Sequence, residues 1–434
     1  MTGSHARPIP ALRWWIGAVL FASTAINYID RQTLSILAPY LKQDYRWTNA
    51  DYANIAIAFR VTYSLGQTLW GRLIDRIGTR RGLTIAVMWY STVSVLTSLA
   101  NGLTSFTVCR FLLGAGESAN WPGASKAVSE WFPKRERALA TALYDSGSSI
   151  GGAVAPFLIL PVYFRWGWRA AFVIPGVLGF VWLVVWRRVY APPEEHPRLG
   201  ERERQLILAD AGEGETTKSE RLRWLDLLRL PQTWGTIIAR AFTDPVWFFV
   251  TDWFPIYLVA KGISLTGGLL AVWVPFLAAD LGNFFGGAAS GYLIRLGWPV
   301  GRARKALVVF GGLGMTLLIP TIFTADLYLI TLLFALATFS YASFSTIANV
   351  LPADLYKRDS VASVSGLSGT AAGIGTIVAF KLIGHFSDAR QATAAHSFDP
   401  IVLVAGLIPF AGAILVLLLV RNSRATDEGL VQRI

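Results

Sequence analysis

The chain has 434 residues, of which 53% are hydrophobic and 15% are charged, and its mean hydropathy is +0.47. Soluble domains carry about 25% charged residues, so this composition excludes an ordinary soluble domain and predicts a protein with many membrane spans. A single cysteine and four scattered histidines exclude a disulfide framework and a spaced metal cluster.

Apolar runs of about 20 residues, the length that crosses a bilayer, recur along the whole chain. They predict twelve spans, at residues 14–37, 52–73, 83–100, 103–126, 138–160, 170–189, 234–259, 267–293, 305–323, 327–351, 361–386 and 400–420. When the N-terminus is placed in the cytoplasm, most of the 39 Lys and Arg residues fall in cytoplasmic segments. The positive-inside rule therefore predicts that both termini are cytoplasmic. Because the net charge of +12 follows this topology, it does not indicate a nucleic-acid partner.

These spans predict an all-α membrane protein with two six-helix bundles, residues 1–189 and 233–434. The polar segment between them, residues 190–232, is predicted to be a solvated cytoplasmic linker with some surface helix. A regulatory or lipid-binding role for this segment is the alternative. Tryptophans near the span ends are predicted to anchor the protein at the membrane surfaces; they are Trp14, Trp15, Trp47, Trp166, Trp168 and Trp298.

The first span carries two adjacent charges, in the stretch Asn27, Tyr28, Ile29, Asp30, Arg31. A charge within the bilayer costs at least about 2.5 kcal/mol, so both side chains must face protein or a water-filled cavity. Neighbouring side chains on a helix point about 100° apart, so Asp30 and Arg31 are predicted to have different partners. One interpretation is a neutralised pair that lets the helix insert. We favour a site in which Arg31 holds an anion and Asp30 carries a proton.

The fourth span contains Arg110 and Glu117, which are seven residues apart and so lie about 10 Å apart along one helix face. They are predicted to share a cavity without touching, while Gly114 and Gly116 let a neighbouring helix or the substrate approach closely. A structural charge network is one interpretation of this pair. The other is that Glu117 loads and releases a proton, with Arg110 setting its affinity for that proton.

A charged loop follows the second span, with the pattern glycine, x, leucine, x, aspartate, arginine, x, glycine, x, arginine, arginine. Its defining residues are Gly71, Asp75, Arg76, Gly78, Arg80 and Arg81. The glycines suit a tight turn and close helix packing. Gly291, Leu293 and Ile294 repeat part of the pattern after the eighth span, although Arg295 stands in the place of Asp75. The loop resembles the signature of the major facilitator superfamily, in which it latches the two halves together on the cytoplasmic side. A plain basic loop is the alternative.

Further motifs narrow this resemblance to the anion:cation symporter family, and within it to the bacterial hexuronate and galactonate transporters. They are the stretch from Asn27 to Arg31, the pair of Arg110 and Glu117, residues 131–138 and the Pro-Glu-Glu-His-Pro run at 193–197. The resemblance covers nearly the whole chain. It implies that Asp30 and Glu117 take part in proton coupling, that Arg31 holds the substrate carboxylate and that Arg110 supports Glu117. It also implies a set of residues that hydrogen-bond the sugar or line its cavity, namely Tyr28, Tyr63, Asn120 and Ser148.

Some residues depart from the relatives. Arg60 in span two and Asp145 in span five are both charged. We favour an ion pair between them over contact of Arg60 with a second anionic group, because an unpaired charge in the bilayer is costly. In the second half, Arg240 and Asp244 are predicted to satisfy each other on one helix face. The sequence assigns no role to two further charges in the spans, Asp280 and Lys381.

The predicted function is proton-coupled symport of a sugar acid anion, such as a hexuronate or an aldonate, across the bacterial inner membrane. Residues 340–349 of span ten lack the His-Gln-Gly-Trp often found in hexuronate carriers, so the identity of the sugar acid is left open. An organic anion or organophosphate antiporter on the same fold, with Arg31 and Arg240 as an anion clamp, is the alternative. No enzyme is predicted, because no nucleophile with its base and no metal cluster is apparent. The expected partners are a small anion and membrane lipids. No cofactor is expected, with protons as the coupling ion, and the protein is expected to work as a monomer.

Overall fold

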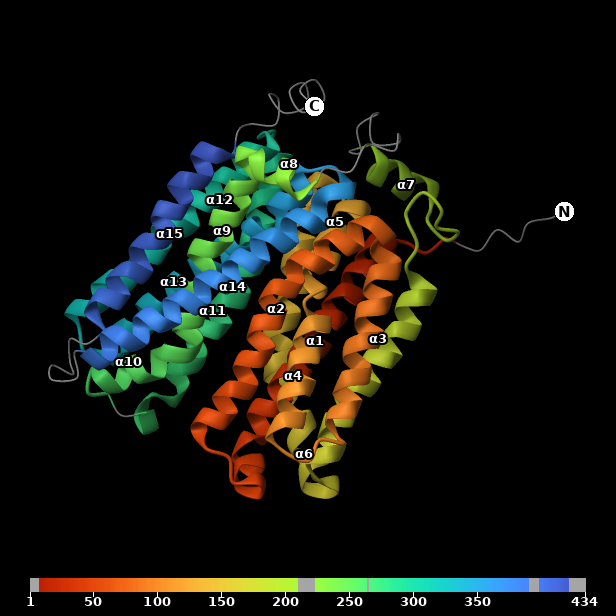
Figure 1. The fold of residues 1–434 in the computed structure, drawn as a ribbon. Coiled ribbons are helices and arrows are strands. Elements are labelled where there is room, and N and C mark those ends of the chain that lie inside the picture. The colour runs from red at the N-terminus through yellow and green to blue at the C-terminus, as the bar shows by residue number, and fades with distance from the viewer. Residues whose placement is uncertain (1–7, 210–222, 264, 390–397, 421–434) are drawn as a thin grey trace. The chain divides into compact units, whose positions relative to one another are not determined.

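The computed structural model describes residues 8–209, 223–263, 265–389 and 398–420. All regular elements within these ranges are helices, which confirms the predicted all-α class. They form two compact units, Met1–Arg221 with Tyr356–Leu367, and Leu222–Leu355 with Ser368–Ile434. Within each unit the long helices run alongside one another (Figure 1).

The first unit contains the six predicted N-terminal spans. Its helices are α1 (Leu12–Tyr45), α2 (Asn49–Ile77), α3 (Thr79–Thr97), α4 (Leu103–Glu117), α5 (Asn120–Trp131), α6 (Lys134–Val189) and α7 (Glu201–Leu208). The predicted fourth span is divided between α4 and α5. The division fits Pro122, which lacks an N–H and is tolerated in the first turn of a new helix. The predicted fifth and sixth spans both lie in α6, which is kinked at Gly167, where φ is 81°.

The second unit contains the C-terminal spans. Its helices are α8 (Trp224–Arg229), α9 (Pro231–Phe248), α10 (Phe254–Ala260), α11 (Leu265–Arg295), α12 (Val300–Met315), α13 (Leu327–Leu355), α14 (Arg358–Ala389) and α15 (Asp399–Leu419). A π-helical segment, Phe249–Trp253, joins α9 to α10, and a 3-10 segment, Thr316–Phe323, extends α12. The first turns of α14, up to Leu367, belong to the first unit.

Five of the described helical stretches are long and apolar enough to cross a membrane by length and composition. They are Lys134–Val189, Val300–Phe323, Leu327–Leu355, Arg358–Ala379 and Asp399–Leu419. The other predicted spans are also helical within the described ranges. The first of them, α1, holds the charges of Asp30 and Arg31 within its length.

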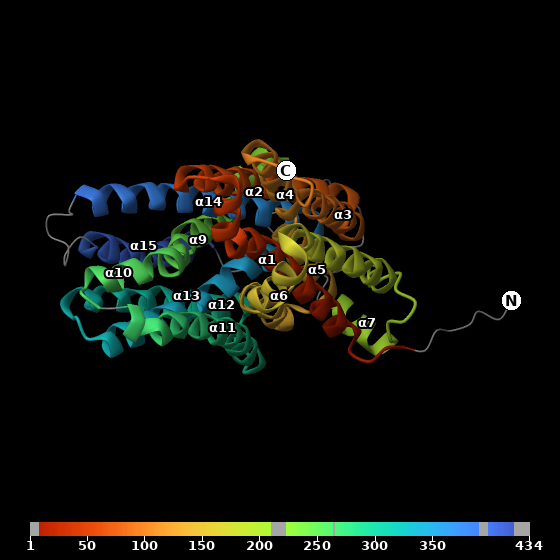
Figure 2. The same ribbon diagram turned by 90° about the horizontal axis from the view of Figure 1, so that it is seen from below.

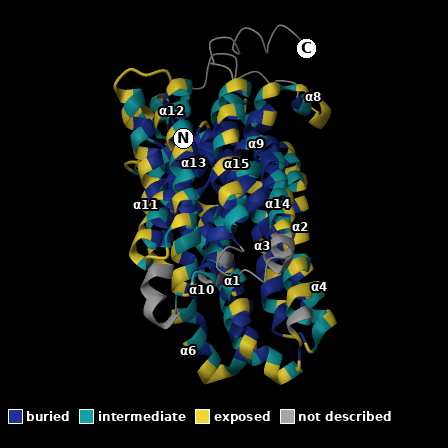
Figure 3. Ribbon diagram, turned by 90° about the vertical axis from the view of Figure 1, so that its left-hand side faces the viewer, coloured by how far each residue is buried: buried dark blue, intermediate teal, exposed yellow. Residues whose placement is uncertain are grey.

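Burial alternates along these helices, with buried and exposed bands on the same helix (Figure 3). The predicted tryptophan anchors divide accordingly. Trp15 and Trp166 are 61% and 65% exposed, as an anchor at the membrane surface requires. Trp47 and Trp168 are each only 8% exposed, because both pack on Phe106, at ring distances of 5.0 and 5.4 Å. For these two the prediction is wrong, and they are core residues at the end of the bundle.

The first part of the predicted linker contains the surface helix α7 and is docked on the first unit through buried apolar residues. Tyr190, Leu199 and Ile207 are buried in the same apolar cluster as Trp131. The helix α7 lies beside the N-terminal end of α1 (Figures 1 and 2). The apolar residues that dock it are interspersed among charged ones, which obscured them in the sequence. Residues 210–222 of the predicted linker lie outside the described residues.

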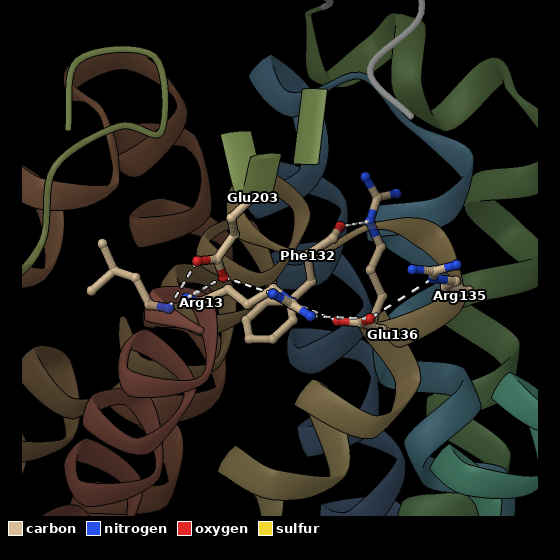
Figure 4. Close-up of polar contacts among 7 residues, drawn as sticks. Arg13, Phe132, Arg135, Glu136 and Glu203 are labelled. Atoms are coloured by element: carbon tan, nitrogen blue, oxygen red, sulfur yellow. Dashed lines mark hydrogen bonds and ion pairs between the residues drawn. The ribbon is translucent and has the colours of Figure 1, made fainter. Parts of the chain in front are cut away.

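Arg13 links α7 to the bundle through two ion pairs (Figure 4). Its guanidinium donates to Glu203 of α7 and to Glu136 of α6, each at 2.7 Å. Glu203 also accepts the backbone N–H groups of Leu12 and Arg13 at 3.1 and 3.2 Å. The first N–H groups of a helix have no partner within it, and the helix N-terminus favours a negative charge. Glu203 therefore caps α1 from a helix that lies 190 residues later in the chain.

Candidate functional site

The centre of the candidate site is an ion pair between the first and fourth predicted spans. The Nε of Arg31 on α1 donates to Oε2 of Glu117 at 2.6 Å, and the Glu117 side chain is 0% exposed. Glu117 occupies the last residue of α4, just before the break that leads into α5. The sequence relates Glu117 only to Arg110 of the same span and does not predict this partner on α1. A partner on another helix cannot be read from the spacing within one span.

Three aromatic rings surround the Arg31 guanidinium. The ring centres of Tyr28, Phe59 and Tyr63 lie 4.8, 5.3 and 4.3 Å from its central carbon. Phe59 and Tyr63 are four residues apart on α2 and stack on each other at 5.5 Å. Cation–π contacts of this kind hold a guanidinium in place without neutralising it. Phe59 was missed in the sequence, where an apolar residue on a membrane helix gives no signal of function.

Asp30 faces a different set of residues, as the helix geometry predicts. It is 1% exposed, and neither carboxylate oxygen makes a hydrogen bond with the described part of the chain. Arg110 and Glu117 of α4 both act on it electrostatically, and Ser94 of α3 lies nearby. Arg110 is buried and acts on both carboxyl groups without an ion pair to either in the described residues. Arg110 and Glu117 thus interact electrostatically without an ion pair between them in the described residues, and the cavity that they are predicted to share stays a prediction.

The two glycines of α4 are used for close packing, as predicted. An added Cβ at Gly114 would lie 2.5 Å from the Phe59 carbonyl oxygen, and one at Gly116 would lie 3.1 Å from Cβ of Tyr90. The first distance is shorter than real contacts allow and the second is tighter than most of them, so α2 and α3 approach α4 where it has no side chains. These contacts bring the aromatic rings of α2 and α3 next to the Glu117 end of α4.

Two further predicted substrate residues make internal hydrogen bonds. The Asn120 amide accepts from Ser23 at 2.8 Å and donates to Thr24 at 3.1 Å, which ties α5 to α1. Ser148 donates to the backbone carbonyl oxygen of Asp145 at 2.7 Å. Their contact with substrate stays a prediction. Tyr63 differs, because its buried hydroxyl has no hydrogen-bond partner within the described residues.

The two departures from the relatives lie in different environments. Arg60 is exposed, whereas Asp145 is only 8% exposed. The ion pair proposed between them stays a prediction. In the second unit, Arg240 and Asp244 form the predicted ion pair on α9, at 3.0 Å. Asp280 is partly buried on α11, and the side chain of Lys381 lies outside the described residues.

The charged loop between α2 and α3 is built as its motif predicts. Gly78 has φ of 86°, which a non-glycine residue rarely adopts, and it forms the turn itself. An added Cβ at Gly71 would lie 2.2 Å from the carbonyl oxygen of Ala362. The basic residues of the loop, Arg76, Arg80 and Arg81, are exposed.

Asp75 connects this loop to the start of α14. Its carboxylate accepts from Lys126 at 2.9 Å and from the backbone N–H groups of Ala362 and Ser363 at 3.3 and 2.7 Å. Burial raises the pKa of Asp75, while the Lys126 ammonium and the Ser363 contacts oppose that rise. In the second unit, Arg295 is exposed, and a different ion pair, Arg304 with Asp354 at 2.8 Å, joins α12 to α13.

A second acid at this end of the first unit was missed in the sequence. Glu130 on α5 accepts hydrogen bonds from Thr79 and from Tyr190, where the docked segment begins. Burial raises its pKa, and Lys126 and the two hydroxyl groups oppose the rise. Arg358 also acts on Glu130 and pairs with Glu194 at 2.6 Å. These contacts join the docked segment to the residues around Asp75.

A model of the Major Facilitator Superfamily matches residues 20–380. The chain belongs to this superfamily. It is 28% identical to the hexuronate transporter of Escherichia coli K12 over 429 residues, which cover 97% of each chain. It is 31% identical to the galacturonate transporter of Dickeya chrysanthemi over 281 residues, 64% of this chain and 81% of that one. The D-galactonate transporter of Escherichia coli O6:H1 is 28% identical, with 93% and 94% covered.

Solved structures agree on the fold. The proton:xylose symporter XylE superposes with a TM-score of 0.73 and 14% identity, covering 95% of this chain and 97% of its own. FucP in its outward conformation gives a TM-score of 0.66, with 16% identity and coverage of 94% and 100%. The predicted family, the predicted fold and the resemblance to sugar acid carriers are thus confirmed. The protein is a multi-pass membrane transporter and not an enzyme.

Proposed function

We propose that this transporter is a proton-coupled symporter that brings a sugar acid anion, a hexuronate or an aldonate, into the cytoplasm across the bacterial inner membrane. Both termini lie on the cytoplasmic side in this proposal. Its main support is the 2.6 Å pair between Arg31 and the fully buried Glu117. Relatives that carry hexuronate, galacturonate and galactonate support the class of substrate.

The pair of Arg31 and Glu117 couples the two ligands by competition. Glu117 presents to Arg31 the same group that a sugar acid would present, a carboxylate. While Glu117 is ionised it occupies Arg31, and when it takes up a proton it releases Arg31 to the substrate carboxylate. Substrate and proton then raise each other's affinity, as symport requires.

The surrounding residues have separate tasks in this scheme. The rings around Arg31 keep its guanidinium in place when Glu117 is protonated and the ion pair is broken. The Tyr28 and Tyr63 hydroxyls bind sugar hydroxyls. Asp30 carries a second proton, and Arg110 sets how readily the two carboxyl groups ionise. Asn120 and Ser148 line the substrate cavity. The six-helix bundles at residues 1–189 and 233–434 rock about that cavity as a monomer.

The loop residues around Asp75 act as the cytoplasmic latch. Asp75 holds the N-terminal part of α14, which comes from the C-terminal half of the sequence. An antiporter that clamps an organic anion between Arg31 and Arg240 has less support, because Arg240 is paired with Asp244 at 3.0 Å.

The test is uptake of labelled galacturonate, glucuronate and galactonate into proteoliposomes with an inward proton gradient. We expect accumulation of at least one of them, its collapse when a protonophore is added, and its loss in Arg31→Gln. Trp166→Phe, at an exposed ring, serves as the control variant. Uptake that ignores the proton gradient, or that requires an internal counter-anion, would refute symport.

A further inference from the structure

Several buried polar atoms around Asp30 have no hydrogen-bond partner within the described residues. They are both carboxylate oxygens of Asp30, both amide atoms of Asn27, Oε1 of Glu117 and the hydroxyl of Tyr90. The four side chains are between 0% and 2% exposed. More than about 90% of buried polar groups in proteins are hydrogen-bonded, either to protein or to ordered water. So many unpaired atoms in one region indicate that water binds there.

Tyr90 is close enough to both carboxyl groups to be affected by each. It lies on α3, and the missing side chain of Gly116 lets it approach α4, where Glu117 follows directly. Both Glu117 and Asp30 act on its phenol electrostatically. Asn27, one turn before Asp30 on α1, is a neighbour of the same hydroxyl. A phenol hydroxyl both donates and accepts one hydrogen bond, so it can pass a proton on without a net change.

The geometry gives Glu117 two different sides. Its Oε2 accepts from Arg31 at 2.6 Å, whereas its Oε1 has no hydrogen-bond partner among the described residues. The aromatic rings around Arg31 come from α1 and α2, and the residues around Asp30 come from α1, α3 and α4. The two oxygens of this one carboxyl group are therefore available for different tasks, Oε2 for Arg31 and Oε1 for proton movement.

We propose that Tyr90 and Asn27 hold ordered water that connects Asp30 to Glu117, and that protons pass along this chain within the first unit. The proposal rests on the proposed symport function. In one transfer, protonated Asp30 donates to water and water donates to the Tyr90 oxygen. Tyr90 in turn gives its own proton to Oε1 of Glu117. Asp30 ends ionised, Glu117 ends neutral, and Tyr90 and the water are unchanged.

The same oxygens could in principle suit a bound sodium ion, but the charges nearby favour water. Arg110 is buried in this region and acts on both Asp30 and Glu117, and its positive charge opposes a cation. Arg31 acts on both carboxyl groups as well. A sodium gradient in place of the proton gradient is therefore expected to drive no uptake.

Tyr90→Phe tests the chain, because it removes one oxygen and keeps the ring that packs in the core. We expect proton-driven uptake to slow by about tenfold or more, the lower end of what a positioned proton-transfer group contributes. Counterflow, the exchange of labelled for unlabelled substrate across the membrane, needs no net proton transfer. It should keep its rate and its KM within about twofold, and Asn27→Ala should show the same split. Tyr257→Phe removes a buried hydroxyl bonded to Thr321 in the second unit and is the matched control.

The outcomes separate this inference from the proposed function. Normal proton-driven uptake in Tyr90→Phe would overturn the inference. An equal loss of uptake and counterflow in Tyr90→Phe would also overturn it, provided that the variant has the melting temperature of the wild type. Uptake driven by sodium alone would overturn it as well. Failure of the wild type itself to accumulate any sugar acid in response to a proton gradient would instead refute symport.

Discussion

Neutralising Glu117 tests whether this carboxylate and the substrate compete for Arg31. In Glu117→Gln the amide keeps the shape of the side chain but never carries a negative charge. A hydrogen bond to a charged group contributes about 1.5–3 kcal/mol, and the bond at 2.6 Å is of this kind. If the substrate must break it at high pH, the variant should bind galacturonate about 10- to 150-fold more tightly than the wild type there.

The difference should disappear in acid. When the wild type holds a proton on Glu117, Arg31 is released in both proteins and their dissociation constants should converge. Titration calorimetry of the purified proteins between about pH 5 and pH 8.5 measures this convergence. The same variant should fail to concentrate galacturonate in proteoliposomes, because it has lost one of the two coupled ligands.

Two results would refute the reasoning. One is that the affinity of Glu117→Gln for galacturonate changes with pH as much as that of the wild type, because the competing charge would then lie elsewhere. The other is accumulation in response to a proton gradient, because the variant could not carry the proton. Glu203→Gln, which makes the same change in the pair with Arg13, should alter neither measurement and controls for general effects on folding.

Three shorter predictions concern the surroundings of the site. Phe59→Leu should raise the KM for counterflow about fivefold, because one cation–π contact of about 1 kcal/mol is lost, and an unchanged KM would exclude a role for this ring. Arg13→Met should lower the stability of the first unit by about 1–3 kcal/mol and speed proteolysis after α7, because it leaves Glu136 and Glu203 without their ion pairs. Equal proteolysis of variant and wild type would mean that apolar packing alone docks α7. Burial raises the pKa of Glu130 above its ordinary value of 4.5, so the folded state binds this proton more tightly than the unfolded state does. The contribution of protonated Glu130 to the free energy of unfolding is therefore present below pH 4.5 and is lost as the pH rises through the higher pKa of the folded state. As the pH is raised above about 4.5, the melting temperature of Glu130→Gln should fall less than that of the wild type. Parallel curves of melting temperature against pH would contradict this prediction.

The fold could be predicted because the membrane restricts what a chain can do. A span of about 20 apolar residues must be a helix, since backbone groups in lipid have no other partners. Charges within such spans are costly, so Asp30, Arg31, Arg110 and Glu117 stood out without any structure. The turn at Gly78 was also predictable, because its positive φ suits glycine.

What could not be predicted is how residues on different helices meet. The pairing of Arg31 with Glu117 requires knowing which faces of α1 and α4 are turned toward each other. Phe59 and Tyr90 are ordinary on a membrane helix, and only the contact of Phe59 with Arg31 and the effect of Glu117 on Tyr90 single them out. The docking of α7 was hidden for the opposite reason. Ile207 lies in a segment whose charges predict solvent exposure, yet it is 2% exposed.

Because Asp30 and Arg31 are adjacent in the sequence, one short stretch of α1 supplies both the acid and the base of the site. Because neighbours on a helix point about 100° apart, one turn of α1 serves two different environments. Arg31 points to the rings of α2, and Asp30 lies among residues of α3 and α4. Glu117 interacts with both, since its Oε2 accepts from Arg31 and its charge acts on Asp30. A proton that arrives through Asp30 can therefore change the charge that Arg31 faces without entering the space that a sugar acid would occupy. Coupling in this scheme depends on the protonation state of Glu117, because that state decides whether Arg31 is paired at 2.6 Å or available to the substrate.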